Sequence, residues 1–242
     1  MRPISLAVAT ALCLSAFASA QGSIDTLNTS AGPVQMIPIM HASVLLRAAG
    51  KVIYIDPAQG KYDGLPAADL ILITDIHGDH MAPDVIRKVS KNGTVVWGPP
   101  AVADKTHVDT TIANGETKKW ENWTIEAIPA YNLKRGPGPG QLYHDKGRGN
   151  GYVLNYGGKR FYFSGDTEAV PEMLALKNID VAFVCMNLPY TMPPDEAAAA
   201  VKAIRPVAVF PYHYRGSDLA AFANPMPAAG INVRLREWYP KD

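Results

Sequence analysis

The stretch Asp69-Leu-Ile-Leu-Ile-Thr-Asp-Ile-His-Gly-Asp-His-Met81 decides the fold. Residues 70–73 are wholly apolar, which indicates a short strand buried on both faces. The strand runs directly into four side chains of the types that bind metal ions, Asp75, His77, Asp79 and His80. A divalent cation would satisfy these carboxylates and imidazoles together, whereas without one they would be electrostatically frustrated. The alternative is that the carboxylates cap a helix and the histidines are ordinary loop residues.

Apolar runs of strand length lie on both sides of this stretch. They cover residues 34–40, 43–48, 51–56, 69–74, 93–97, 123–129, 151–156, 159–164, 180–185, 207–211 and 231–235. Gly50-Lys51 and Gly157-Gly158 separate neighbouring runs as tight hairpins would. Helical patterns cover residues 82–91, 99–106, 168–177, 194–205 and 217–223. Strands dominate the first half and alternate with helices in the second, so we expect two packed sheets with helices outside them.

The composition places the chain among soluble globular proteins. It has 242 residues, of which 48% are hydrophobic and 19% are charged, enough apolar material for one large core. Lys and Arg number 23 against 22 Asp and Glu, which leaves no basic excess for a phosphate backbone and disfavours nucleic acid as a partner. The sequence contains no Gly-x-Ser-x-Gly, no Walker loop and no dinucleotide fingerprint.

The first twenty residues have the pattern of an export signal. Arg2 is followed by the almost wholly apolar residues 4–18 and by Ala18-Ser19-Ala20, a small-x-small cleavage pattern. The apolar run is short for a membrane span of about 20 residues, so we expect no stable membrane anchor, a retained anchor being the alternative. We therefore predict a signal peptide at 1–20, a flexible mature N-terminus at 21–33 and one domain at 34–242, in a secreted or periplasmic protein.

Cleavage would leave a single thiol in the mature chain. It removes Cys13 and retains Cys185, so no intramolecular disulfide is expected. Cys185 ends the apolar run 181–185, which indicates a buried thiol in a strand rather than a nucleophile.

Residues 75–80, Asp-Ile-His-Gly-Asp-His, resemble the His-x-His-x-Asp-His signature of the metallo-β-lactamase superfamily, with aspartate in place of the first histidine. Ser164-Gly165-Asp166-Thr167 is similar to the motif whose aspartate bridges two metals, and Pro211-Tyr212-His213 to the motif of the final histidine ligand. The opening His41-Ala42-Ser43-Val44, followed by residues 53–57, resembles the subgroup of ascorbate-phosphate lactonases and N-acyl phosphatidylethanolamine phospholipases. The resemblance implies an α+β fold, the four-layer αββα sandwich of this superfamily.

The resemblance also implies two divalent metal ions, Zn, Mn or Fe, that share Asp166. One position would be held by Asp79, His80 and His213. The other would have Asp75 and His77, but the histidine that usually follows a strand such as 123–128 is missing, because Pro129-Ala130-Tyr131-Asn132 stands there. His144 is the candidate replacement, with a loop histidine as the alternative reading, and the Tyr131 phenol is a second candidate. We expect His41 to be structural or to support a ligand, and His107 to lie on the solvated surface.

The exchange of imidazole for carboxylate at Asp75 hardens the site, which shifts its preference toward manganese, iron or magnesium and away from strict zinc. The function implied is a secreted hydrolase that uses a metal-bound hydroxide on an ester, lactone, amide or phosphodiester, with Asp79 and Asp166 as catalytic residues. The alternative is a metal- or ligand-binding module on the same fold without hydrolytic activity.

The substrate is expected to be a small molecule. Lys146, Arg148 and Tyr214 are the candidate substrate contacts, and the two cations would suit an anionic carboxylate or phosphate. The alternative for Lys146 and Arg148 is a charged hairpin tip exposed to water.

The export signal predicts the first residue of the exported protein. Exported protein should begin at Gln21, because Ala18-Ser19-Ala20 supplies the small residues that signal peptidases require. N-terminal sequencing of exported material checks this, and a soluble exported chain that still begins at Met1 would contradict it.

Overall fold

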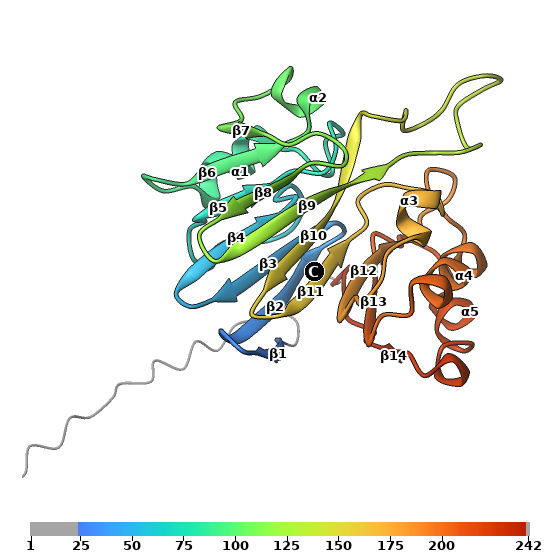
Figure 1. Ribbon diagram of the computed structural model, residues 1–242. Coiled ribbons are helices and arrows are strands. Elements are labelled where there is room, and N and C mark those ends of the chain that lie inside the picture. Colours follow the sequence, from blue (N-terminus) through green and yellow to red (C-terminus); the bar gives the residue numbers. More distant parts are fainter. Residues whose placement is uncertain (1–23, 241–242) are drawn as a thin grey trace, which may run out of the picture.

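The computed structural model describes residues 24–240, so the signal peptide expected at 1–20 lies outside the described residues. Two seven-stranded sheets pack against each other (Figure 1). The first, in spatial order, is β1 Asp25–Thr29, β2 Gly32–Met40, β3 Ser43–Ala48, β4 Lys51–Ile55, β5 Leu70–Leu72, β6 Val95–Gly98 and β7 Thr110–Thr111. The second, in chain order, is β8 Thr117–Trp120, β9 Trp123–Ala130, β10 Gly149–Tyr156, β11 Lys159–Phe163, β12 Val181–Cys185, β13 Ala208–Tyr212 and β14 Asn232–Val233.

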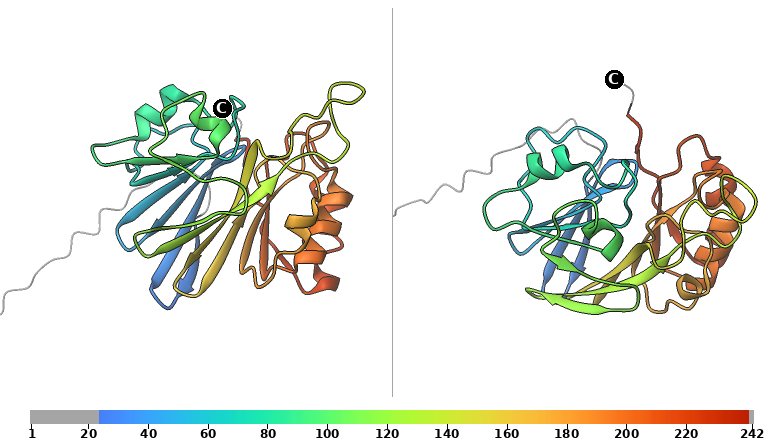
Figure 2. Two further views of the ribbon diagram at one scale, coloured as in Figure 1. Left: turned by 45° about the horizontal axis from the view of Figure 1, so that its top comes forward. Right: turned by 90° about the horizontal axis from the view of Figure 1, so that it is seen from above.

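The helices cover the outer faces of the two sheets. Helices α1 (Pro83–Val89) and α2 (Pro100–Ala103) lie beside the first sheet. Helices α3 (Pro171–Leu174), α4 (Pro194–Ile204) and α5 (Leu219–Ala223), and the short 3-10 helix Pro227–Ala229, lie beside the second (Figure 2). The layers are therefore helix, sheet, sheet and helix, as expected for an αββα sandwich.

Each sheet changes from antiparallel to parallel pairing along its width. In the first sheet β1 to β4 pair antiparallel and β4 to β7 pair parallel. In the second, β8 to β11 pair antiparallel and β11 to β14 pair parallel. Parallel strands need crossover connections, and the helices of each outer layer lie in them.

The main core lies between the sheets and is rich in aromatic rings. Phe183 stacks between Phe163 and Phe210, with ring centroids 4.7 Å apart on each side, one ring from each of β11, β12 and β13. All three are fully or almost fully buried, and each buried ring contributes about 1.5–3 kcal/mol. A second cluster, which includes Tyr54 and Ile71, lies under α1. Strands β4 and β5 are thus buried on both faces, which explains why their sequences do not alternate.

Two hydrogen bonds fasten the sheets together near the loop after β5. The Asn150 backbone N–H donates to the carbonyl of Thr74 at 2.9 Å, and the Tyr152 hydroxyl donates to the carbonyl of Ile73 at 2.8 Å. The end of β5 is therefore held directly against β10 of the opposite sheet.

The prediction of a flexible segment at 21–33 is wrong from residue 25 onward. Residues 25–29 form β1, which pairs antiparallel with β2, and a bidentate ion pair joins Asp25 to Arg236 near the C-terminus. The sequence of this edge strand, Asp-Thr-Leu-Asn-Thr, does not show the apolar pattern of a strand, because Leu27 is its one large apolar side chain. Leu27 packs against the core. Strands β7 and β8 were also missed, the first because it has two residues and the second because it is a lysine-bearing edge strand.

Within residues 24–240 no helix has both the length and the apolar character that a membrane span requires.

Cys185 lies fully buried in β12, as predicted. Its thiol contacts the carbonyl oxygen of Thr167 at 3.5 Å, and burial raises the pKa of the thiol to about 11.

We therefore expect Cys185 to resist iodoacetamide at mildly alkaline pH in the folded protein, and to react readily in concentrated guanidinium chloride, because the thiolate is the reactive form. Peptide mass spectrometry of the two samples checks this. Native labelling as fast as labelling of the unfolded chain would show that the thiol is accessible.

Candidate metal centre

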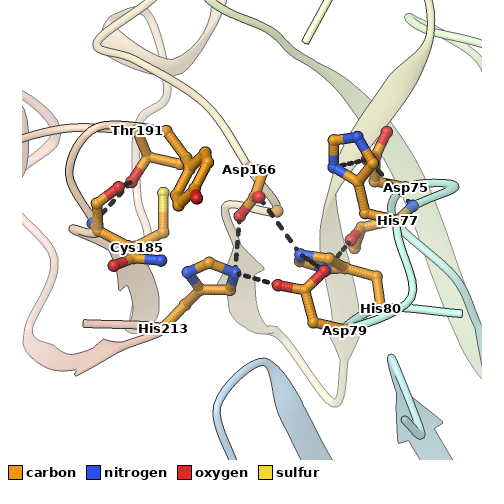
Figure 3. Close-up of polar contacts among 12 residues, drawn as sticks. Asp75, His77, Asp79, His80, Asp166, Cys185, Thr191 and His213 are labelled. Atoms are coloured by element: carbon orange, nitrogen blue, oxygen red, sulfur yellow. Dashed lines mark hydrogen bonds and ion pairs between the residues drawn. The ribbon is translucent and has the colours of Figure 1, made fainter. Parts of the chain in front are cut away.

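The predicted ligands converge at one end of the sandwich, although they come from both sheets (Figure 3). Residues 75–80 follow β5 of the first sheet, whereas Asp166 follows β11 and His213 follows β13 of the second. His144 comes from the long connection between β9 and β10. Side chains at the carboxyl ends of parallel strands are brought together in this way because those ends lie at one edge of a sheet.

Asp166 lies at the centre of the group. Its Oδ1 is 3.2 Å from His213 Nε2, and its Oδ2 is 3.3 Å from His80 Nε2 and 3.1 Å from His144 Nε2. Asp166, His80, His144 and His213 are all buried. One carboxylate is therefore shared by three imidazoles, which is the arrangement expected of a residue that bridges two metal positions.

Asp79 completes the group around His80 and His213. Its Oδ2 lies 3.4 Å from His213 Nε2 and 3.0 Å from His41 Nε2, and its Oδ1 lies 4.0 Å from His80 Nε2. We call Asp79, His80, Asp166 and His213 the Asp79 group. These are the residues that the sequence predicts for the complete metal position.

A second group lies on the other side of Asp166. His77 Nδ1 is 3.0 Å from Asp75 Oδ2, and the His77 and His144 rings are 5.1 Å apart at their centroids. Ligand atoms of Asp75, His77 and His144 all lie within 4.8 Å of one another. We call these three residues the Asp75 group. The structure thus brings His144 to the place where the sequence lacks the usual histidine.

Several buried nitrogen and oxygen atoms at the centre have no hydrogen-bond partner among residues 24–240. His80 Nε2, His144 Nε2, His213 Nε2 and Asp166 Oδ1 are all buried atoms of this kind, although they lie close together. Unpaired buried polar atoms are rare in native proteins because each costs about 1–3 kcal/mol. Imidazole nitrogens and carboxylate oxygens are ligands for Zn, Mn and Fe, so a divalent cation fits this donor set.

Two residues outside the predicted set hold the imidazoles in place. Asp56, fully buried after β4, lies 2.7 Å from His80 Nδ1 and accepts hydrogen bonds from both the backbone and the hydroxyl of Thr74. Asn132 Oδ1 lies 2.6 Å from His144 Nδ1. Metal-binding histidines commonly use their other nitrogen in this way, which leaves Nε2 for the metal. The sequence signals for Asp56 are its place at the end of an apolar run and within residues 53–57, which carry part of the family resemblance, but neither signal indicates a contact with His80.

The backbone is strained where it positions the site. His41, Asp56 and His213 have φ angles of 56°, 46° and 48°, a region that non-glycine residues rarely adopt. Gly165, before Asp166, has a φ of 59°, and a Cβ there would lie 2.6 Å from the carbonyl oxygen of Asn150. Such strain persists only where the surroundings enforce it, and it concentrates at functional sites.

The electrostatics of the centre favour a positive charge. Burial opposes the charged forms, but His213 and His80 hold the pKa of Asp166 well below its usual value. Burial likewise opposes ionisation of Asp79, yet the nearby His213 imidazole and the hydrogen bond from His41 lower its pKa. Against its own burial, the carboxylates of Asp166 and Asp56 raise the pKa of His80 well above its usual value. Asp79 and Asp166 are therefore anions that attract a cation between them.

His41 supports Asp79 from the turn between β2 and β3. Its Nδ1 is 2.6 Å from the Tyr239 hydroxyl and its Nε2 is 3.0 Å from Asp79 Oδ2. Burial lowers the pKa of this imidazole to about 4, so we assign the neutral form with Nε2–H donating to Asp79. This contact agrees with the expectation that His41 supports a ligand.

The remaining candidates each have a hydrogen-bond or ion-pair partner within the described residues. Lys146 pairs with Glu172, and the Tyr131 hydroxyl also donates to Glu172. The Tyr131 phenol therefore has a partner other than the two candidate metal positions. Tyr214 donates to the carbonyl of Arg236 at 3.4 Å. Both Asp75 oxygens accept hydrogen bonds from Arg148. His107 is a surface residue, as predicted, with its side chain 80% exposed.

Comparison with known proteins identifies the family. The beta-lactamase superfamily domain matches residues 38–213, which is most of the described chain. The chain belongs to the metallo-β-lactamase superfamily. This confirms the superfamily that the motifs indicate, and the architecture described above agrees with it.

Relatives in this superfamily are named as hydrolases. A UPF0173 metal-dependent hydrolase from Thermus thermophilus is 33% identical over 188 residues, 72% of this chain and 80% of its own. A crystal structure of a protein described as a metal-dependent hydrolase from Parabacteroides distasonis is 37% identical, with a TM-score of 0.85 over 90% of this chain and all of its own. The metallo hydrolase Igni18 from Ignicoccus hospitalis shares the fold, with a TM-score of 0.70 and 24% identity over 84% of this chain and 94% of its own.

Asp56 generates a prediction about metal affinity. Asp56→Asn removes the charge that accepts from His80 Nδ1, so we expect the metal affinity to fall about 10- to 100-fold, the usual cost of losing such a partner. Competition with a metal-sensitive dye measures it. Asp69→Asn is the matched control, because Asp69 also accepts from a backbone N–H of the same sheet, at Val52, yet it lies at the amino end of β5, whereas the predicted ligands follow the carboxyl end of that strand. Equal affinities in the two variants would show that Asp56 does not support the ligand.

Proposed function

We propose that this protein is a metal-dependent hydrolase that holds up to two divalent cations, Zn, Mn or Fe, and cleaves an ester, lactone, amide or phosphodiester. The observation that carries the proposal is the convergence of unpaired buried imidazole nitrogens on the shared carboxylate of Asp166. The names of the relatives from Thermus thermophilus and Parabacteroides distasonis support the reaction class.

The residues divide into ligands and supports. The Asp79 group would hold one cation and the Asp75 group the other, with Asp166 common to both. Bound divalent cations supply a Lewis acid for the scissile carbonyl or phosphoryl group and activate water at neutral pH.

Asp79 has a second role in this proposal. Its Oδ2 accepts from the neutral His41 imidazole, which fixes the carboxylate and keeps it ionised. An ionised carboxylate beside the centre can orient the attacking water and accept its proton. Asp166 lies between His80, His144 and His213, and it therefore fixes the position of the Asp79 group relative to the Asp75 group.

The surroundings of the His144 loop favour a substrate with an apolar portion. Leu133, Leu188 and Tyr190 are each about half exposed, and the Tyr143 ring packs edge-on against Tyr190 at 5.0 Å. The Asn132 side chain, which supports His144, also donates to the carbonyl of Tyr190, so this apolar rim adjoins the centre. The cations proposed for an anionic substrate, Lys146 and Arg148, are already paired with Glu172 and Asp75.

Secretion belongs to the same proposal and is supported by the sequence of the first twenty residues. The alternative function is a metal- or ligand-binding module without hydrolytic activity. The relatives from Thermus thermophilus and Parabacteroides distasonis, which are named as metal-dependent hydrolases, weigh against it.

The proposal predicts both a metal content and an activity. Protein purified from metal-replete medium should carry up to two divalent ions per chain by elemental analysis. It should hydrolyse at least one member of a panel of apolar and anionic esters, lactones, amides and phosphodiesters. Chelation should abolish this activity, and metal addition should restore it.

Asp166→Asn should lose both metal and turnover, whereas Asp180→Asn, a matched change at a carboxylate that pairs with Lys159, should retain both. Negligible metal that cannot be restored would refute the proposal. Bound metal with no turnover across the panel would support the non-hydrolytic alternative instead.

A further inference from the structure

Asp75, the carboxylate that stands in place of the family's first histidine, forms an ion pair with Arg148. Arg148 Nε donates to Asp75 Oδ1 at 3.0 Å, and its terminal nitrogen donates to Oδ2 at 3.1 Å. The Asp75 side chain is 2% exposed and that of Arg148 is 18% exposed. A two-pronged pair of this kind is strong and directional, and the sparse solvent around it screens it little.

The remaining lone pairs of Asp75 are nearly used up. Each carboxylate oxygen accepts about two hydrogen bonds. Oδ2 already accepts from Arg148 and lies 3.0 Å from the Nδ1 of His77, whose backbone N–H is 3.4 Å away. Only Oδ1 retains capacity for a cation.

The charges of the two ligand groups therefore differ. In the Asp79 group, the neighbours of Asp79 and Asp166 are imidazoles, which in their neutral form place no fixed positive charge beside a bound cation. In the Asp75 group, the partner of the carboxylate is a guanidinium, which cannot be deprotonated. Its fixed positive charge neutralises Asp75 and repels a cation placed beside it.

We propose that the Arg148–Asp75 pair makes the two metal positions unequal, so that the Asp79 group binds the first ion tightly and the Asp75 group binds a second only weakly. Asp75 then acts as a positioning residue that orients His77, and not as a full anionic ligand. This differs from the sequence prediction that Asp75 ligates directly, and it rests on the metal-binding part of the proposed function.

Removal of the guanidinium provides the test. In Arg148→Met the buried Asp75 carboxylate loses its only fixed cation, so a metal ion becomes the group that can satisfy it. We expect metal-free wild-type protein, titrated calorimetrically with Mn²⁺ and separately with Zn²⁺, to bind a second equivalent at least about tenfold more weakly than the first. Arg148→Met should bind the second equivalent about tenfold more tightly than wild type, with the larger gain for Mn²⁺, which prefers carboxylate.

Two further variants separate charge from packing. Arg148→Lys keeps the positive charge and should bind the second equivalent within about twofold of wild type. Arg160→Met is the matched control, because Arg160 makes an equivalent two-pronged pair with Glu126 on β9, and both of its equivalents should bind as in wild type. The first equivalent serves as an internal measure of folding in every variant.

The outcomes are distinct. Two equal, tight equivalents in wild type would overturn this inference while leaving the proposed function intact. A loss of the second equivalent in both Arg148→Met and Arg148→Lys, with the first retained, would also overturn it, because Arg148 would then be holding Asp75 as a direct ligand. Absence of any metal binding in wild type would instead defeat the proposed function.

Discussion

The sharing of the Asp166 carboxylate among His80, His144 and His213 is the interaction on which the arrangement of the site depends. These four side chains come from four separate connections and from both sheets, and Asp166 is the residue that the three imidazoles approach. Its position is fixed by Gly165, whose left-handed backbone passes too close to Asn150 for any side chain. The Gly165 N–H also donates a hydrogen bond of 3.0 Å to the buried hydroxyl of Tyr212. The core of the second sheet thereby holds the carboxylate in place.

The site is costly to build without a cation. The ionised carboxylate of Asp166 is buried together with the imidazoles of His80, His144 and His213, and strained backbone occurs at His41, Asp56 and His213. The stacked phenylalanines between the sheets and the hydrogen bonds from β10 to the end of β5 offset these costs. A scaffold of this rigidity can present ligands in a fixed geometry, which loops alone could not do.

Much of this could be predicted from the sequence, because buried strands and strand-end motifs are local patterns. The two packed sheets with outer helices and the buried Cys185 follow from apolar runs, whereas the αββα sandwich and the Asp79 group are implied by the resemblance of the strand-end motifs to the metallo-β-lactamase superfamily. Asp56 and Asn132 could not be found in this way, since their role depends on contacts with residues 24 and 12 positions away. The pairing of Arg148 with Asp75 spans 73 positions, and no local pattern distinguishes it from a solvated charge. Strand β1 was missed because an edge strand needs few apolar side chains.

Asn132 has a consequence for how this protein can change. One amide contacts the ring of His144, donates to the carbonyl of Tyr190 and donates to the buried carboxylate of Glu168. The backbone of Tyr190, on the apolar rim, is therefore connected through a single residue to a ring that faces the shared carboxylate. A change that moves the backbone at Tyr190 will shift that ring unless this amide keeps its contacts. The exposed side chains of Leu133, Leu188 and Tyr190 take no part in the contacts of Asn132, so they can be exchanged while the His144 ring stays in place.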